Sequence, residues 1–162
     1  MNSDGAAQGE ASRPRTWVLP PIPYVTALVL GWWLDRNVLP LPCNLGAATS
    51  PLGWLWVGLG LALSAWTLVT FRLRRTTVNP YKAASALCTD GPFRISRNPI
   101  YLGDWLILTG SSLLLHTWWP LLFAPLLWAA LRFGVIRHEE KHLEAKFGDE
   151  YRKYKIHVRR WI

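Results

Sequence analysis

The sequence predicts an all-α, polytopic membrane protein with about four transmembrane helices and a C-terminal amphipathic helix on the cytoplasmic side. Of the 162 residues, 51% are hydrophobic and only 17% are charged, and the length fits one compact domain. Apolar stretches that approach the length of a membrane span recur four times, which a soluble domain of this size would not carry. Lys and Arg gather between and after these stretches, as is typical of the cytoplasmic side of a membrane protein.

The predicted spans lie near residues 18–39, 52–71, 100–115 and 119–136. The last two are shorter than the about 20 apolar residues that cross the hydrocarbon core, so we expect them to form a short hairpin. Several of the eleven Trp residues fall near predicted span ends, as in an interfacial aromatic belt. Residues 1–16 are polar and rich in Gly, Ala and Ser, which predicts a disordered tail. Residues 17–162 would then form a single membrane domain.

Charge placement predicts the orientation of these spans. The loop over residues 72–98 and the tail over residues 137–162 hold most of the basic residues. Because Lys and Arg stay cytoplasmic, we expect both termini, this loop and this tail to face the cytoplasm. The net charge of +8 then indicates topology and attraction to anionic membrane lipids, not nucleic-acid binding.

Cys43 and Cys88 are the two cysteines of the chain. They should lie on opposite sides of the membrane, which makes a disulfide between them geometrically implausible. Neither has a neighbouring His or Cys at metal-ligand spacing, so no metal site is expected.

The first chemical motif opens the third span and reads Gly-Pro-Phe-Arg-Ile-Ser-Arg-Asn-Pro-Ile-Tyr-Leu-Gly over residues 91–103. Pro99 disfavours helix at Asn98 and suits a first helical turn, so the helix should begin there with free backbone N–H groups. Such a helix start, with Arg94 and Arg97 beside it, binds carboxylates or phosphates readily. A capped membrane anchor is the structural alternative, and it explains the arginines but not the whole motif.

The second motif follows the hairpin, where Glu139 and Glu140 are adjacent acids in a basic strip. Apolar and aromatic residues follow at three- and four-residue intervals: Leu143, Phe147, Tyr151 and Tyr154. These intervals predict one face of an amphipathic helix that lies on the membrane or covers a pocket. From periodicity alone, an interfacial helix whose acids pair with neighbouring basic residues is the favoured interpretation.

Together the two motifs resemble the isoprenylcysteine carboxyl methyltransferase and phospholipid methyltransferase superfamily. The similarity covers residues 76–162 and includes the run Glu-Glu-Lys-His-Leu, then Phe-Gly-Asp-Glu-Tyr and a further Tyr. The resemblance implies an integral membrane methyltransferase that uses S-adenosylmethionine and acts on a lipophilic substrate at the cytoplasmic membrane face. Residues 158–162 depart from the proline-containing ending that is usual in the family.

Carried over by position, the resemblance implies a cofactor site built from both motifs. Its residues would be Arg94, Arg97, Asn98, Pro99, Tyr101, Leu102, Gly103, Glu139, Glu140, Leu143, Tyr151 and Tyr154. The candidate catalytic residues are Arg97, Glu140 and Arg132. The helix start and an arginine would take the carboxylate of the cofactor, and Glu139 or Glu140 would take its ammonium or ribose hydroxyls. A general-base role for a Glu is less favoured, because no unique methyl acceptor is visible.

Asp104 and Arg132 are ionisable residues inside the edges of their predicted spans, where charges are usually paired or functional. A direct ion pair between them and an Arg132 that holds an anionic group of substrate or cofactor are equally weighted alternatives. Three further functions stay open: an NADPH-dependent reductase of the membrane sterol reductase type, a phospholipid amine N-methyltransferase, and a non-catalytic membrane scaffold. The sequence does not identify the methyl acceptor, whether carboxylate, amine or thiol, or the oligomeric state.

Overall fold

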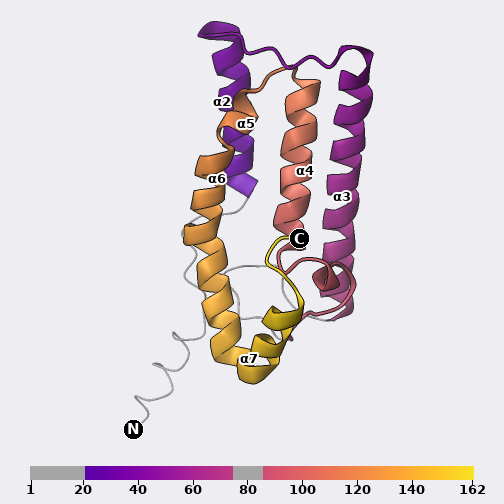
Figure 1. The fold of residues 1–162 in the computed structure, drawn as a ribbon, viewed down its shortest axis with the longest axis vertical. Helices are drawn as coiled ribbons and strands as arrows, with labels where there is room; N and C mark the ends of the chain where they lie inside the picture. The colour runs from indigo at the N-terminus through magenta and orange to yellow at the C-terminus, as the bar shows by residue number, and fades with distance from the viewer. Residues whose placement is uncertain (1–20, 75–85) are drawn as a thin grey trace.

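The computed structural model describes residues 21–74 and 86–162, which form helices joined by short loops (Figure 1). The all-α prediction is confirmed for these residues, which hold no strand and a single isolated bridge between Pro42 and Thr117. The predicted disordered tail over residues 1–16 lies outside the described residues. So do the start of the first predicted span and the middle of the predicted loop over residues 72–98.

Three helices correspond to the first three predicted spans: α2 (Pro21–Asn37), α3 (Thr49–Leu73) and α4 (Pro99–Leu114). Short 3₁₀ turns precede α3 and α4, as η1 (Gly46–Ala48) and η2 (Gly91–Arg94). The chain then continues through α5 (Trp119–Leu122), α6 (Ala124–Leu131), the π-helical turn η3 (Arg132–Ile136) and α7 (Arg137–His157). The helices α2, α3, α4 and α6 run roughly along the long axis of the molecule, whereas the end of α7 does not (Figure 1).

The predicted fourth span over residues 119–136 is not one helix. It breaks at Phe123, because Pro125 in the first turn of α6 has no backbone N–H to continue the preceding helix. At its other end it does not stop, since α6 passes through η3 directly into α7. The last apolar stretch and the polar tail therefore form one continuous helical segment.

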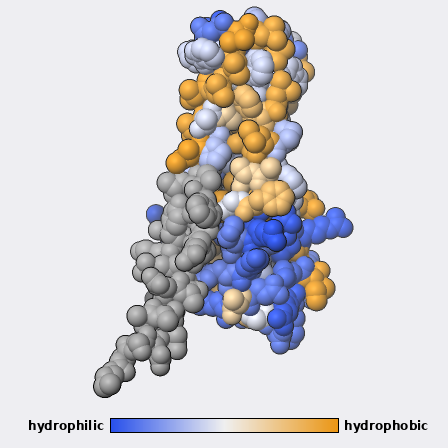
Figure 2. All heavy atoms as spheres, turned by 90° about the vertical axis from the view of Figure 1, so that its left-hand side faces the viewer, coloured by the Kyte–Doolittle hydropathy of each residue, from blue (hydrophilic) through white to orange (hydrophobic). Residues whose placement is uncertain are grey.

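Among the described residues, only the helical segment Gly46–Leu73 is long and apolar enough to cross a membrane. With 17 and 16 residues, α2 and α4 are shorter, so the four-span prediction is not confirmed. Large apolar side chains are nevertheless exposed along α2 and α3, among them Val29, Trp33, Trp54 and Leu61. Figure 2 shows apolar groups gathered over the half of its face that holds α2, and polar groups over the half that holds α7.

Glycines bring α3 and α4 into backbone contact. A Cβ atom at Gly60 would lie 2.6 Å from the carbonyl oxygen of Gly103, and one at Gly110 would lie 2.6 Å from that of Gly53. Small residues permit this approach between helices. A Cβ atom at Gly103 would lie 2.5 Å from Oγ of Ser64, so Gly103 packs against α3. The missing side chain of Gly103 is thus explained by its contact with α3, and its predicted place in a cofactor pocket stays a prediction.

Replacing Gly60 with Ala is expected to lower the free energy of unfolding by about 1–3 kcal/mol, because the added methyl group overpacks the contact with α4. Gly58 offers a matched control, since nothing lies within 4 Å of the position that its Cβ would take. Gly58→Ala should be neutral or stabilising by up to about 1 kcal/mol through helix propensity. Thermal unfolding of detergent-purified protein measures both, and equal melting temperatures for the two variants would contradict the close contact.

The buried core lies between α2, α4, α6 and η3. It includes Tyr24, Tyr101, Leu131 and Ile136, and Trp161 packs against it from the end of the chain. Tyr24 donates a hydrogen bond to the backbone oxygen of Tyr101 over 3.5 Å. This core fixes the first turns of α4 against the start of α7, which is where both sequence motifs meet.

The second half of α7 turns back on the first half at Gly148. This glycine has φ 51° and ψ −121°, a left-handed conformation that side chains rarely adopt. The reversal is visible at the lower end of the molecule (Figure 1). The prediction of one continuous amphipathic face is therefore wrong, since Leu143 and Phe147 precede the reversal and Tyr151 and Tyr154 follow it.

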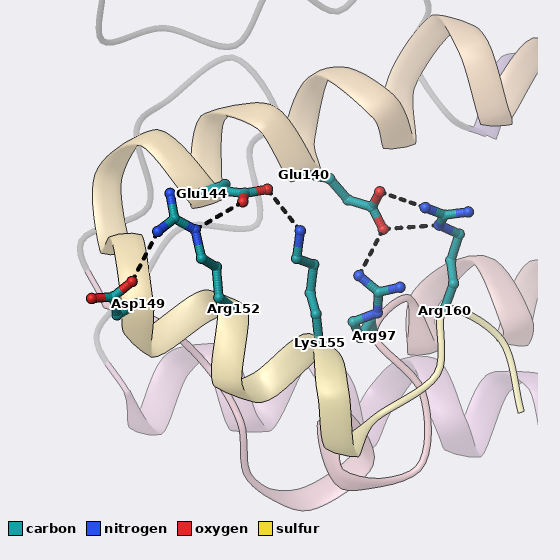
Figure 3. A network of polar contacts seen from close by, with 7 residues as sticks. All are labelled: Arg97, Glu140, Glu144, Asp149, Arg152, Lys155 and Arg160. Atoms are coloured by element: carbon teal, nitrogen blue, oxygen red, sulfur yellow. Dashed lines mark hydrogen bonds and ion pairs between the residues drawn. The ribbon is translucent and has the colours of Figure 1, made fainter.

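Ion pairs join the two arms of α7 across this reversal (Figure 3). Glu144 on the first arm contacts Arg152 at 3.2 Å and Lys155 at 2.7 Å on the second arm. Arg152 also contacts Asp149 at 2.9 Å. Residues eight and eleven positions apart would not meet along a straight helix, so these pairs are specific to the folded-back form.

Candidate functional site

The candidate site lies at the first turn of α4, which begins at Pro99 as predicted. Asn98 precedes the helix without capping it; its side-chain amide instead donates to the backbone oxygen of Arg160 over 3.0 Å. Ser96 donates to the same oxygen over 3.1 Å, and the Arg97 amide donates to the oxygen of Arg159 over 3.0 Å. The C-terminal segment (residues 158–162) thus lies along the loop that enters α4.

Glu140 on α7 is clamped by two arginines (Figure 3). Nε and Nη2 of Arg160 contact its two carboxylate oxygens at 2.8 and 2.6 Å, which is a bidentate pair. Nη1 of Arg97 lies 3.0 Å from Oε1 of the same carboxylate. The side chains of Arg97, Glu140 and Arg160 are only 12%, 16% and 26% exposed, so solvent screens this cluster weakly.

Arg97 keeps donors that no described group uses. Its Nε and Nη1 atoms are buried and have no hydrogen-bond partner among the described residues, and the contact of Nη1 with Glu140 is an ion pair without hydrogen-bond alignment. Buried N–H groups without a partner are costly, and a guanidinium carries five of them. Together with the free N–H groups at the start of α4, Arg97 provides a place for an anion.

Glu139 differs sharply from its neighbour Glu140. It accepts a hydrogen bond from the Tyr101 hydroxyl over 3.0 Å and forms no ion pair within the described part of the chain. Burial raises the pKa of Glu139 to about 7; the Tyr101 hydrogen bond opposes this rise, and the charge of Glu140 adds to it. The two adjacent acids therefore differ in their partners. Glu140 is paired with two arginines, whereas Glu139 has no cation beside it among the described residues and can bind one from a ligand.

Two tyrosines from the second arm of α7 line the site next to the arginines. Tyr151 is fully buried, and burial and the charge of Glu140 raise its pKa to about 12, against the opposing effect of Arg97 and Arg160. The Tyr154 hydroxyl donates to the backbone oxygen of Phe93 over 2.7 Å. The folded-back arm thus brings both predicted tyrosines onto the loop before α4.

Some predicted site residues are not brought together. Arg94 is exposed at the end of η2 and forms no ion pair with any described residue. Leu102 and Leu143 are half-buried, and their predicted contact with a cofactor stays a prediction.

The predicted ion pair between Asp104 and Arg132 is wrong: among the ion pairs of the described residues, none joins them. Arg132 begins the π-helical turn η3, where the chain departs from a regular α-helix. Its guanidinium lies 5.9 Å from the ring centre of Phe133 on its own helix. The alternative role, in which Arg132 holds an anionic group, stays a prediction.

Sequence reasoning missed Arg160 and Ser96. Arg160 lies twenty residues from Glu140, and no helical or strand period connects the two positions. Its one signal is the pair of arginines in a C-terminal segment that departs from the family's usual ending. Ser96 lies inside the first motif, but a serine between two basic residues carries no pattern that indicates its contact with residue 160.

Comparison with known proteins bears directly on these two motifs. The model of the phospholipid methyltransferase family matches residues 49–150, which are more than half of the chain and include the first motif and the second motif as far as residue 150. The chain belongs to this family. Protein-S-isoprenylcysteine O-methyltransferase of Schizosaccharomyces pombe is 31% identical over 111 residues, which are 68% of this chain and 47% of that protein. The description of the family and the name of this relative are both those of methyltransferases.

A second similarity is short. An uncharacterized protein of Haemophilus influenzae is 67% identical over 27 residues, which are 17% of this chain and 43% of that protein. The chain thus spans less than half the length of the curated relatives that it matches. No solved structure matches the chain.

Proposed function

We propose that the chain is a multi-pass membrane methyltransferase that uses S-adenosylmethionine and methylates a lipophilic substrate at the cytoplasmic membrane face. The observation that supports it most is that the site holds two groups of opposite charge preference. Among the described residues, Arg97 keeps buried N–H donors without a hydrogen-bond acceptor, and Glu139 keeps a carboxyl that no cation contacts. The methionine part of S-adenosylmethionine presents one carboxylate and one ammonium, which matches this pair.

Within the proposed site, Arg97 and the first N–H groups of α4 would hold the carboxylate, while Glu139 would hold the ammonium. Tyr151 and Tyr154 would line the site and limit the access of water. When bound, the cofactor supplies an electrophilic methyl group. The remaining task of the protein is to hold the acceptor in line with it at close range. The direct contact of Glu140 with the cofactor stays a prediction, and its two oxygens already accept from arginine.

Arg132 would act on the lipophilic substrate. It lies where the apolar α6 meets the charged α7, half-buried in a π-helical turn, a feature that is frequent at functional sites. A cation at this level suits an anionic group of a membrane-embedded substrate. A phospholipid amine N-methyltransferase is the second candidate, favoured by the family whose model matches residues 49–150.

Equilibrium binding to the detergent-purified full chain tests the proposal. We expect S-adenosylmethionine to bind and NADPH not to bind. Binding of NADPH alone would support a reductase of the sterol reductase type, and binding of neither would support a non-catalytic scaffold. Either result would overturn the proposed function.

The proposed topology is tested with introduced cysteines, because Cys43 and Cys88 are free but buried and burial raises the pKa of both thiols. Ala47 in η1 and Lys153 in the second arm of α7 are exposed. The start of α3, which follows η1, and α7 lie at opposite ends of the molecule (Figure 1). An impermeant maleimide added to intact cells should label Ala47→Cys and should label Lys153→Cys only after permeabilisation. Labelling of both from outside would contradict the cytoplasmic placement of the tail.

A further inference from the structure

We infer that Arg160 is a positioning residue: by neutralising Glu140 it leaves Arg97 free to take the anionic group of a ligand. The inference rests on the proposed function, because it concerns the anion-binding half of the same site. Nothing in the two motifs assigns a role to Arg160, which comes from the C-terminal segment (residues 158–162).

The geometry shows how the three side chains share their bonds. Glu140 offers two carboxylate oxygens, and Arg160 engages both of them at 2.8 and 2.6 Å. Arg97 reaches only Oε1, at 3.0 Å, and its Nε and Nη1 donors remain without a hydrogen bond in the described part of the chain. Without Arg160, the Glu140 carboxylate would be free to form a fork-to-fork pair with Arg97, because that geometry is the preferred one for arginine. Arg97 would then lose the donors that a ligand needs.

The net charge of this cluster supports the same role for Arg160. Arg97, Glu140 and Arg160 together carry one net positive charge, so an arriving carboxylate brings the cluster to neutrality. Without Arg160 the remaining pair is already neutral, and the same carboxylate would add an uncompensated negative charge. Because the cluster is largely buried, such a charge is costly.

The backbone of the C-terminal segment holds Arg160 in place. The backbone carbonyl oxygen of Arg160 accepts hydrogen bonds from the side chains of Ser96 and Asn98. The carbonyl oxygen of Arg159 accepts one from the backbone N–H of Arg97. Trp161 packs against the buried core next to it. Isolated surface pairs contribute little because two mobile side chains must be ordered, but here the guanidinium starts from a fixed backbone.

The test measures S-adenosylmethionine binding by calorimetry on the full chain in detergent. Arg160→Ala should weaken binding at least tenfold, and Arg160→Lys should recover part of that loss by restoring the charge. Adding Glu140→Gln to Arg160→Ala should also recover part of it, since Arg97 then has no carboxylate to pair with. Arg159→Ala is the matched control: its side chain is exposed and outside the clamp, so binding should stay at the wild-type level.

A merely structural role of Arg160 predicts a different pattern, in which the double variant binds no better than Arg160→Ala. That result would overturn the inference, and so would wild-type affinity in Arg160→Ala. If the double variant does not fold, Arg160→Lys and Arg160→Gln decide: equal losses in both would overturn the role of charge. Failure of the wild-type protein to bind S-adenosylmethionine would instead overturn the proposed function, and this inference with it.

Discussion

Replacing Arg97 with Ala is expected to abolish most S-adenosylmethionine binding and methyl transfer while the protein still folds. Removing one partner of a buried charge pair costs about 2–5 kcal/mol of binding, which is roughly thirtyfold or more in affinity. Folding should survive, because Glu140 keeps its bidentate pair with Arg160 and is not left as an unpaired buried charge. Calorimetry, with circular dichroism on the same sample, separates the two effects.

The conservative variant Arg97→Lys shows whether the site needs a guanidinium or only a positive charge at this position. A lysine keeps the positive charge near the membrane but not the planar fork that engages a carboxylate. We therefore expect partial recovery of binding. Full recovery would show that Arg97 serves only as a positive anchor, and its role in the site would then be wrong.

Glu139→Gln is expected to weaken S-adenosylmethionine binding at least tenfold, since a hydrogen bond to a charged group contributes about 1.5–3 kcal/mol. The amide oxygen of the glutamine still accepts the Tyr101 hydrogen bond, so the core contact and the melting temperature should be preserved. Glu150→Gln, on the exposed surface of the same helix, is the matched control and should bind like the wild type. Unchanged affinity in a folded Glu139→Gln variant would remove Glu139 from the site.

The raised pKa of Glu139 adds a pH signature to this experiment. In the folded, ligand-free protein the carboxyl is protonated below about pH 7, whereas in the unfolded chain it ionises near its ordinary value. Its contribution therefore makes the fold less stable as pH rises from about 4.5 to 7, and a bound ammonium reverses this by favouring the ionised form. Affinity should rise by up to about tenfold per pH unit below 7 and level off above it. Tyr101 and Glu140 act on this carboxyl, and His138 and His142 lie on the same helix. Measuring the pH dependence of Glu139→Gln as well separates the contribution of Glu139 from those of the other groups.

The parts of the fold that follow from local chemistry were predictable from the sequence. Pro99 restricts Asn98 and begins a helix, and α4 begins there. The long apolar stretch over residues 52–71 lies within α3, the helix that has spanning length. Both rest on properties of a residue or a segment itself, independent of what packs against it.

The parts that depend on distant contacts were not predictable. Adjacent acids look equivalent in sequence, but a helix rotates Glu139 toward Tyr101 and Glu140 toward two arginines. The periodicity of α7 continues through Gly148, so the pattern gives no sign of the reversal at that residue. Arg160 reaches Glu140 only because the C-terminal segment is bonded to the loop before α4.

Gly103 lies within the first motif, but its contact was not predictable from the sequence either. Its place in the resemblance indicated a ligand, whereas its missing side chain serves the contact between α3 and α4. A glycine permits any close approach, and the sequence does not say whether a cofactor or a helix makes it.

Methyl transfer itself tests the central claim most directly. Purified protein would be incubated with methyl-labelled S-adenosylmethionine and a total lipid extract, and the organic phase then counted. We predict labelled lipophilic product from the wild type, and little from Arg97→Ala at the same protein concentration. Label that stays in the aqueous phase with the wild-type protein, although it is folded and supplied with the lipids of its own membrane, would contradict the proposed function.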